Sequence, residues 1–158
     1  MPAGGRAPRP APLDIFEESF DVRRLLNRGR LLRAAADWKG EPLLALAVTR
    51  NRLEIHYRIG AEWVRTDVEA PRGRPLVQLL GSELLLVAGP ESRRSPGGDA
   101  EPNGSVFGLD GELLDRILLG DGVADVHGTA SGRLWVAYGL LGTTGDYGVH
   151  GWGRLSPE

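Results

Sequence analysis

The chain has 158 residues and no run of about 18 apolar residues, so its length and hydropathy exclude a membrane-spanning helix and favour a single domain. Glycine (23) and proline (11) are abundant and 41% of the residues are apolar, which predicts many short elements joined by tight turns. The absence of cysteine excludes disulfides, thiolate metal sites and a cysteine nucleophile. The net charge of -2 divides into +4 for residues 1–74 and -6 for residues 75–158, and neither half is basic enough to predict nucleic acid as a partner.

The first thirty residues precede the repetitive part of the chain. Residues 1–12 are rich in proline, glycine and alanine and lack the apolar core of about 7 to 15 residues that a secretory signal carries. We therefore expect a disordered tail and a cytoplasmic location. For residues 13–30, a capping-box pattern that begins at Asp14 predicts a short helix, whereas the spacing of apolar residues over 20–26 equally suits a strand.

Internal repetition is the most informative feature of the sequence. The segment Leu84-Leu-Leu-Val-Ala-Gly89 aligns with Leu134-Trp-Val-Ala-Tyr-Gly139, and residues 43–48 are a looser first copy. Each is a short apolar run bounded by turn residues, which is typical of a strand buried on both faces. Upstream of each copy lies another apolar segment, at residues 31–36, 76–80 and 123–127.

The repetition continues downstream of these segments. Residues 105–112 align with residues 151–158, and Asp110-Gly111 predicts a primed hairpin turn because glycine accepts a positive φ. Fourth strands are predicted over 62–68 and 113–119, and the third copy stops where its fourth strand would begin. Four short strands in each unit of about 45 residues are the signature of a β-propeller blade.

The predicted fold is therefore all-β. We expect a partial β-propeller of about three four-stranded antiparallel blades within one domain of residues 13–158. The alternative is an ordinary β-sandwich. The predicted blades span residues 31–68, 75–119 and 123–158.

The run Leu119-Gly-Asp-Gly-Val-Ala-Asp-Val-His127, followed by Gly132-Arg-Leu-Trp-Val-Ala-Tyr138, resembles a blade of NHL-type propellers and of propeller-like proteins of actinobacteria. These families carry similar Gly-Asp-Gly and Gly-Arg-hydrophobic-Trp-Val patterns. The resemblance covers about 30 residues well and about 110 loosely, and it implies a bacterial protein with a propeller-type fold. Function does not follow from such a fold, which serves binding platforms, sensors and some hydrolases.

The number of predicted blades is smaller than a propeller needs. Propellers close with about 4 to 8 blades, and an open arc leaves strand edges unpaired. We therefore expect that the chain is a fragment of a longer reading frame or that copies assemble through their open blade edges.

The candidate site lies on the face that carries the long loops. In a propeller, the loops from second to third strand and the links between blades emerge on one face, and here the long connections are residues 90–104 and 140–150. The link around Asp121 opens on this face, with Asp125 and His127 on the innermost strand beside it. The candidate ligand-binding residues are Asp121, Asp125, His127, Asp146 and His150.

These residues also have structural explanations. Asp121 between two glycines suits a turn, and Asp125 suits hydrogen bonds that tie neighbouring blades together. Two histidines and scattered carboxylates lack the spacing of zinc or calcium sites, so no metal, cofactor or catalytic residue is predicted. The leading function is a non-enzymatic binding or scaffold module whose protein or small-molecule ligand lies on the long-loop face. The alternatives are part of a propeller hydrolase or lyase with a metal at the channel mouth, or a truncated protein.

The environment of Trp135 is a specific expectation of the propeller fold. Both faces of a blade are covered by neighbouring blades, so we expect Trp135 to be buried and its replacement by alanine to abolish cooperative folding.

Overall fold

The structure is a computed structural model that describes residues 27–140 and the strand at residues 152–155. It has three antiparallel sheets, each a meander in chain order. The first sheet contains β1 (Arg30–Ala36), β2 (Pro42–Thr49), β3 (Arg52–Ile59) and β4 (Glu62–Glu69). The second contains β5 (Leu76–Leu80), β6 (Leu84–Ala88), β7 (Gly104–Gly108) and β8 (Leu113–Ile117). The third contains β9 (Val123–Gly128), β10 (Leu134–Tyr138) and β11 (Trp152–Leu155).

The prediction of an all-β fold is confirmed, because the described ranges contain no helix of even one turn. The sheets span residues 30–69, 76–117 and 123–155, whereas the predicted blades span residues 31–68, 75–119 and 123–158. The described strands do not form a propeller, since a propeller is a closed ring of about 4 to 8 sheets and these are three. The predicted tail at residues 1–12 and nearly all of the helix-or-strand segment at 13–30 lie outside the described residues. No helix among the described residues is long and apolar enough to cross a membrane.

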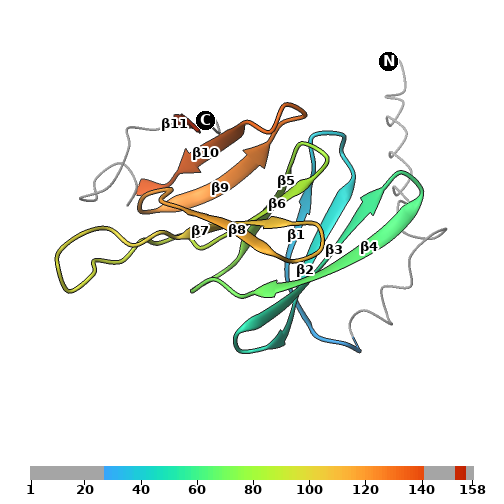
Figure 1. Ribbon diagram of the computed structural model, residues 1–158, viewed down its shortest axis with the longest axis horizontal. Helices are drawn as coiled ribbons and strands as arrows, with labels where there is room; N and C mark the ends of the chain where they lie inside the picture. Colours follow the sequence, from blue (N-terminus) through green and yellow to red (C-terminus); the bar gives the residue numbers. More distant parts are fainter. Residues whose placement is uncertain (1–26, 141–151, 156–158) are drawn as a thin grey trace, which may run out of the picture.

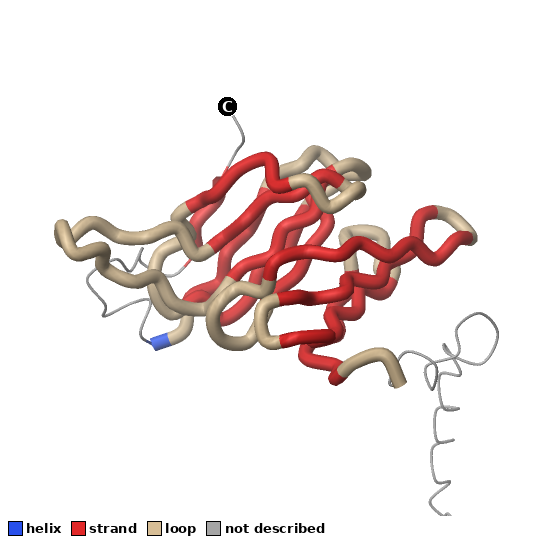
Figure 2. Tube along the Cα trace, turned by 60° about the horizontal axis from the view of Figure 1, so that its bottom comes forward, coloured by secondary structure: helices blue, strands red, loops and turns tan. Residues whose placement is uncertain are grey.

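The second sheet is covered on both faces, which explains its apolar sequence. It lies between the first and third sheets (Figures 1 and 2). One cluster of buried side chains joins it to the first sheet through Ile55, Tyr57 and Leu85, among others. A second cluster joins it to the third sheet through Leu86 and Val136. All five residues of β5 are buried, whereas β8 at the other edge of the same sheet is mostly exposed.

The sheets approach each other most closely at their first strands. The side chain of Gln78 in β5 donates a hydrogen bond of 2.8 Å to the carbonyl of Ala36 at the end of β1. On the other side, Gly128 of β9 lies so close to β5 that a Cβ there would overlap the backbone oxygen of Leu79. Glycine therefore fits at position 128 because the two backbones leave no room for a side chain.

A hydrogen-bond chain also links the first and second sheets. The hydroxyl of Tyr57, a fully buried residue, bonds that of Thr66 at 3.0 Å, and the Thr66 hydroxyl donates to the carbonyl of Leu109 at 2.6 Å. The two buried hydroxyl groups of this chain are thus satisfied across the contact between the sheets.

Four turns share one geometry, and the predicted primed turn at Asp110-Gly111 is wrong. The amide of Gly111 donates to the carbonyl of Gly108 at 3.0 Å, and the amide of Gly108 donates to the carbonyl of Glu112 at 2.9 Å. Gly111 has a φ of +90°, but no residue other than glycine has a positive φ in the described ranges, so Asp110 does not adopt the primed conformation. This is a three-residue turn that ends in a glycine bulge. The same pattern recurs at residues 37–41, 95–99 and 129–133.

The prediction that Trp135 is buried is wrong. Its side chain is 42% exposed, because it lies on the face of the third sheet that points away from the second sheet. Leu134 and Val136, on either side of it in β10, point toward the second sheet and are buried. The expectation of two covered faces holds for the second sheet and fails for the third.

The close approach at Gly128 gives a first testable prediction. Gly128→Ala forces β9 and β5 apart and should lower the free energy of unfolding by about 1 to 3 kcal/mol, as overpacking of a core does. Urea denaturation measures the change. The control is Gly97→Ala in the β6–β7 loop, where a Cβ meets only ordinary van der Waals contacts. Equal losses for the two variants would contradict the packing of β9 on β5.

Candidate functional site

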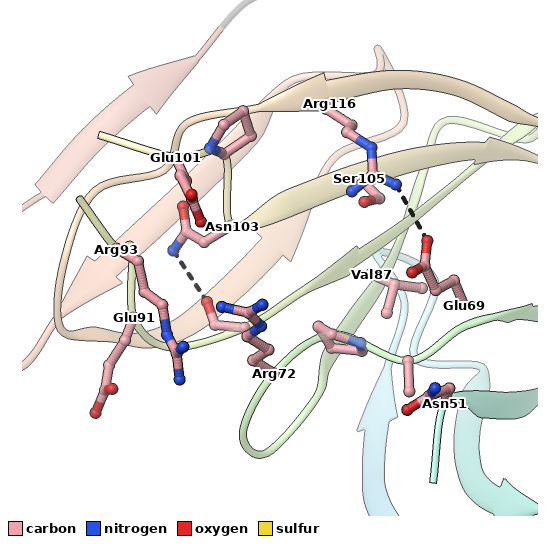
Figure 3. Close-up of a pocket in the computed structure, with 14 residues that line it drawn as sticks. Asn51, Glu69, Arg72, Val87, Glu91, Arg93, Glu101, Asn103, Ser105 and Arg116 are labelled. Atoms are coloured by element: carbon pink, nitrogen blue, oxygen red, sulfur yellow. Dashed lines mark hydrogen bonds and ion pairs between the residues drawn. The ribbon is translucent and has the colours of Figure 1, made fainter. Parts of the chain in front are cut away.

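A pocket opens between the first and second sheets at the end of the molecule that carries the long β6–β7 connection. Its cavity volume is about 400 Å³, and we call it the loop-face pocket. The β2–β3 turn, the β4–β5 link, the β6–β7 loop and the strands β7 and β8 form its walls (Figure 3). The residues that carry its polar chemistry are Asn51, Glu69, Arg72, Glu91, Arg93, Glu101, Asn103, Ser105 and Arg116.

Asn103 anchors the long loop that forms one wall of this pocket. Its amide nitrogen donates to the carbonyls of Gly89 at 3.1 Å and Gly120 at 2.9 Å, and its amide oxygen accepts from the backbone nitrogen of Leu119 at 2.9 Å. One side chain therefore ties both ends of the loop to the β8–β9 link. These three hydrogen bonds fix the position of the loop that forms this wall.

The loop also holds itself together. The hydroxyl of Ser92 donates to the carbonyl of Glu101 at 2.6 Å, across the base of the loop. Nearer the tip, a β-bridge joins Arg94 and Ala100. These bonds make the loop a short extension of the hairpin, which keeps its polar side chains at fixed places on the rim.

The charges of the loop-face pocket are mixed, and part of them is already paired. Arg116 of β8 contacts Glu69 of β4 at 3.1 Å, so this ion pair spans the two sheets. Arg72 and Arg93 have no ion-pair or hydrogen-bond partner for their guanidinium groups among the described residues. In Figure 3, the Arg72 side chain points into the pocket between the Asn103 end and the Glu69–Arg116 end. A planar guanidinium in this position is suited to a carboxylate or a phosphate, which it can bind with two hydrogen bonds.

The structure separates the residues that the sequence grouped into one site. Asp121 accepts a hydrogen bond of 3.0 Å from the backbone nitrogen of Ser92, and so supports the wall of the loop-face pocket. Asp125 and His127 line a different pocket, which lies along the first strands and which we call the inner-strand pocket. Asp146 and His150 lie outside the described residues. Within residues 27–140, no group of three or more histidine or carboxylate side chains is placed to hold a metal ion.

A buried polar cluster on β3 was not predicted from the sequence. Glu54 and His56 are each less than a tenth exposed, and their side chains contact each other at 3.2 Å. Arg28 binds both carboxylate oxygens of Glu54, at 2.9 and 3.0 Å. The strand Leu53-Glu-Ile-His-Tyr57 alternates apolar and polar residues, which is the signal by which β3 could have been found. The same alternation assigns Glu54 and His56 to solvent, and only tertiary packing shows that they are buried.

The cluster shifts the pKa of both its titratable groups. The hydrogen bonds of Arg28 hold the pKa of Glu54 at about 2, against an ordinary value of 4.5. Burial lowers the pKa of His56, and the nearby Glu54 opposes that shift. The carboxylate is therefore kept ionised and the imidazole is favoured in its neutral form.

Comparison of the chain with models of protein families, with curated proteins and with solved structures finds no match.

The anchoring role of Asn103 is testable by one isosteric change. Asn103→Asp keeps the acceptor for Leu119 but replaces a double donor with a carboxylate facing the carbonyls of Gly89 and Gly120. It should lower the free energy of unfolding by about 1 to 3 kcal/mol and speed hydrogen exchange over residues 90–102. Asn51→Asp is the matched control, because Asn51 lines the same pocket and its side chain has no hydrogen bond among the described residues. Equal effects of the two substitutions would refute the anchor.

The Glu54 cluster predicts a specific pH dependence. Since the pKa of Glu54 is about 2 in the fold and 4.5 ordinarily, its ionised form stabilises the fold above pH 4.5 and this contribution disappears as the pH falls to about 2. Glu54→Gln should therefore unfold more easily than the parent at neutral pH, by about 1 to 3 kcal/mol, and the difference should shrink over that pH window. Denaturation curves at a series of pH values measure it, with Glu62→Gln at the exposed start of β4 as control. A difference that is independent of pH would contradict the assignment.

Proposed function

We propose that this chain is a non-enzymatic binding or scaffold module, built from antiparallel β-meanders, whose ligand lies in the loop-face pocket. The observation that carries the proposal is that an anchored loop lies beside two guanidinium groups that are available to a ligand. Asn103 holds the β6–β7 loop in place, and beside it the guanidinium groups of Arg72 and Arg93 have no partner within the described part of the chain. Preorganised polar groups around a concave surface are the usual features of a ligand site.

The chemistry of the pocket favours a ligand that bears an anionic group. Because Arg116 is already paired with Glu69, the cations available to a ligand are Arg72 and Arg93. Glu91 and Glu101 on the same rim make the surroundings nearly neutral overall, which suits a ligand that also carries a positive or hydrogen-bond-donating group. A segment of a partner protein and a small carboxylate or phosphate compound both meet this description.

The scaffold supports a role in binding. The loops lie at the ends of the strands, outside the packed faces of the three sheets. Their sequences can therefore change without disturbing the packing. The pocket at the loop end joins residues from two sheets, so a ligand there contacts both and stabilises their contact.

Loss of one arginine tests the proposal. We expect small anions such as inorganic phosphate, citrate or an acidic dipeptide to raise the thermal unfolding midpoint. A ligand that binds only the folded state, at a concentration of about 100 times its Kd, raises the free energy of unfolding by about 2.7 kcal/mol. Arg72→Ala should abolish this rise. The matched control is Arg74→Ala, two residues further along the same link and outside the lining of the pocket, which should keep it. If none of the anions raises the midpoint, or if Arg72→Ala responds like the parent, the loop-face pocket is not the site.

A further inference from the structure

The inner-strand pocket is separate from the loop-face pocket and has a different chemistry. Its cavity volume is about 280 Å³, and it is lined by β1, β5, β9 and β10, where the three sheets meet at their first strands. Ligand pockets for drug-sized molecules range from about 300 to 1,000 Å³, so this one suits a smaller molecule. Its charged, hydrogen-bonding and aromatic groups come from the side chains of Arg33, Gln78, Asp125, His127 and Trp135.

Two polar atoms of this pocket are buried without a hydrogen-bond partner. Gln78 is 4% exposed, its amide nitrogen is bonded to Ala36, and its amide oxygen has no partner among the described residues. The Nε of Arg33 is buried and unpartnered in the same way. A buried polar atom without a partner costs about 1 to 3 kcal/mol, so such an atom calls for a partner, which a bound water, ion or other molecule can supply. The amide oxygen of Gln78 needs a hydrogen-bond donor, and the Nε–H of Arg33 needs an acceptor. A hydroxyl group can serve as both.

The charge of the pocket disfavours an ionic ligand. Arg33 of β1 and Asp125 of β9 form an ion pair of 2.6 Å that spans the pocket. The guanidinium and the carboxylate neutralise each other, so a charged ligand would have to break this pair in order to gain a partner. The second oxygen of Asp125 stays free to accept a hydrogen bond, because the described bonds from Arg33 and from the amide of Val126 both go to Oδ1. The pocket is thus neutral overall and rich in hydrogen-bonding groups.

An exposed tryptophan supplies an apolar surface beside these groups. Trp135 of β10 lies directly opposite His127 of β9 in the register of the third sheet, and Ala137 lies opposite Asp125. These four side chains therefore share one face of the sheet. At 42% exposure, Trp135 presents a large ring surface to a ligand that reaches the polar groups at the same time.

We propose that the inner-strand pocket binds a neutral saccharide, with the apolar face of one sugar ring on Trp135 and its hydroxyl groups on Gln78, Arg33, Asp125 and His127. A sugar ring matches each feature of the pocket. It is uncharged, it is small, it carries hydroxyl groups that donate and accept, and its axial C–H groups form an apolar face for an aromatic ring. The site is independent of the loop-face pocket, so either proposal can fail without the other.

The test follows the indole N–H signal of Trp135 in the full chain by NMR, with the signal assigned from its loss in Trp135→Ala. The probes are the methyl glycosides of glucose, galactose and mannose at millimolar concentration, with choline chloride and sodium phosphate as charged comparators. We expect at least one glycoside to shift the signal to saturation and neither charged compound to do so. For the variants, binding is measured by ligand-observed saturation-transfer NMR, which does not depend on the indole.

Trp135→Ala and Gln78→Met should each weaken glycoside binding by about tenfold or more, which is about 1.4 kcal/mol. Trp135→Ala should keep the thermal midpoint of the parent because the ring is exposed, so it tests the site even if Gln78→Met fails to fold. The control is Leu114→Ala, which removes an exposed apolar side chain from β8, away from the pocket. The proposal is overturned if no glycoside shifts the signal, if choline or phosphate binds more tightly than every glycoside, or if Trp135→Ala binds as the parent does.

Discussion

The burial of one strand governs the arrangement of this protein. β5 is an edge strand of its sheet, yet all five of its residues are buried, because the first strand of each neighbouring sheet lies against it. Val77 and Leu79 enter the cluster shared with the first sheet, whereas Leu76 and Leu80 enter the cluster shared with the third. An edge strand exposed to water is a template for unwanted pairing, and packing β5 between two others removes that exposure. The two faces of the second sheet then form two continuous hydrophobic cores.

The pockets follow from this arrangement. The sheets meet at their first strands, and the long β6–β7 connection, anchored by Asn103, forms one wall of the pocket between the first and second sheets. Where the first strands converge, the polar side chains of β1, β5 and β9 face one another, and Arg33 reaches Asp125 across 92 residues of sequence. Both candidate sites therefore combine residues that no local motif connects. Neither site is formed by a single sheet.

The sequence predicted the strands well and their surroundings unevenly. Repeated apolar runs such as Leu84–Ala88 are buried on both sides, and period and composition are enough to recognise that state. The turn at Asp110-Gly111 was placed correctly but assigned the wrong type, because the dipeptide fits both a primed turn and a glycine bulge. Trp135 was expected to be buried because a repeat pattern treats all sheets alike, and the pattern carries no information on which sheet stands at the end of the stack.

The sites were harder to predict than the strands. Asp125 and His127 were chosen for their place on a first strand, and the structure does put them in one pocket, but Arg33 and Gln78, which line the same pocket, come from other sheets. Hydrophobic periodicity does not report contacts between sheets. Glu54 and His56 show the converse problem, since alternation in β3 assigns them to solvent and packing buries them with Arg28. Polar residues on strands are therefore where sequence reasoning was least informative.

Hydrogen exchange of the two edge strands of the second sheet tests this account most directly. β5 and β8 each pair with a single neighbour, so their backbone hydrogen bonding is comparable, and they differ in whether other sheets cover them. Native-state exchange should show the bonded amides of β5 opening only with global unfolding, whereas those of β8 should exchange by local opening at a much lower free energy. Equal protection of the two strands would contradict the central position of β5, and with it the stacking of three sheets on which both pockets depend.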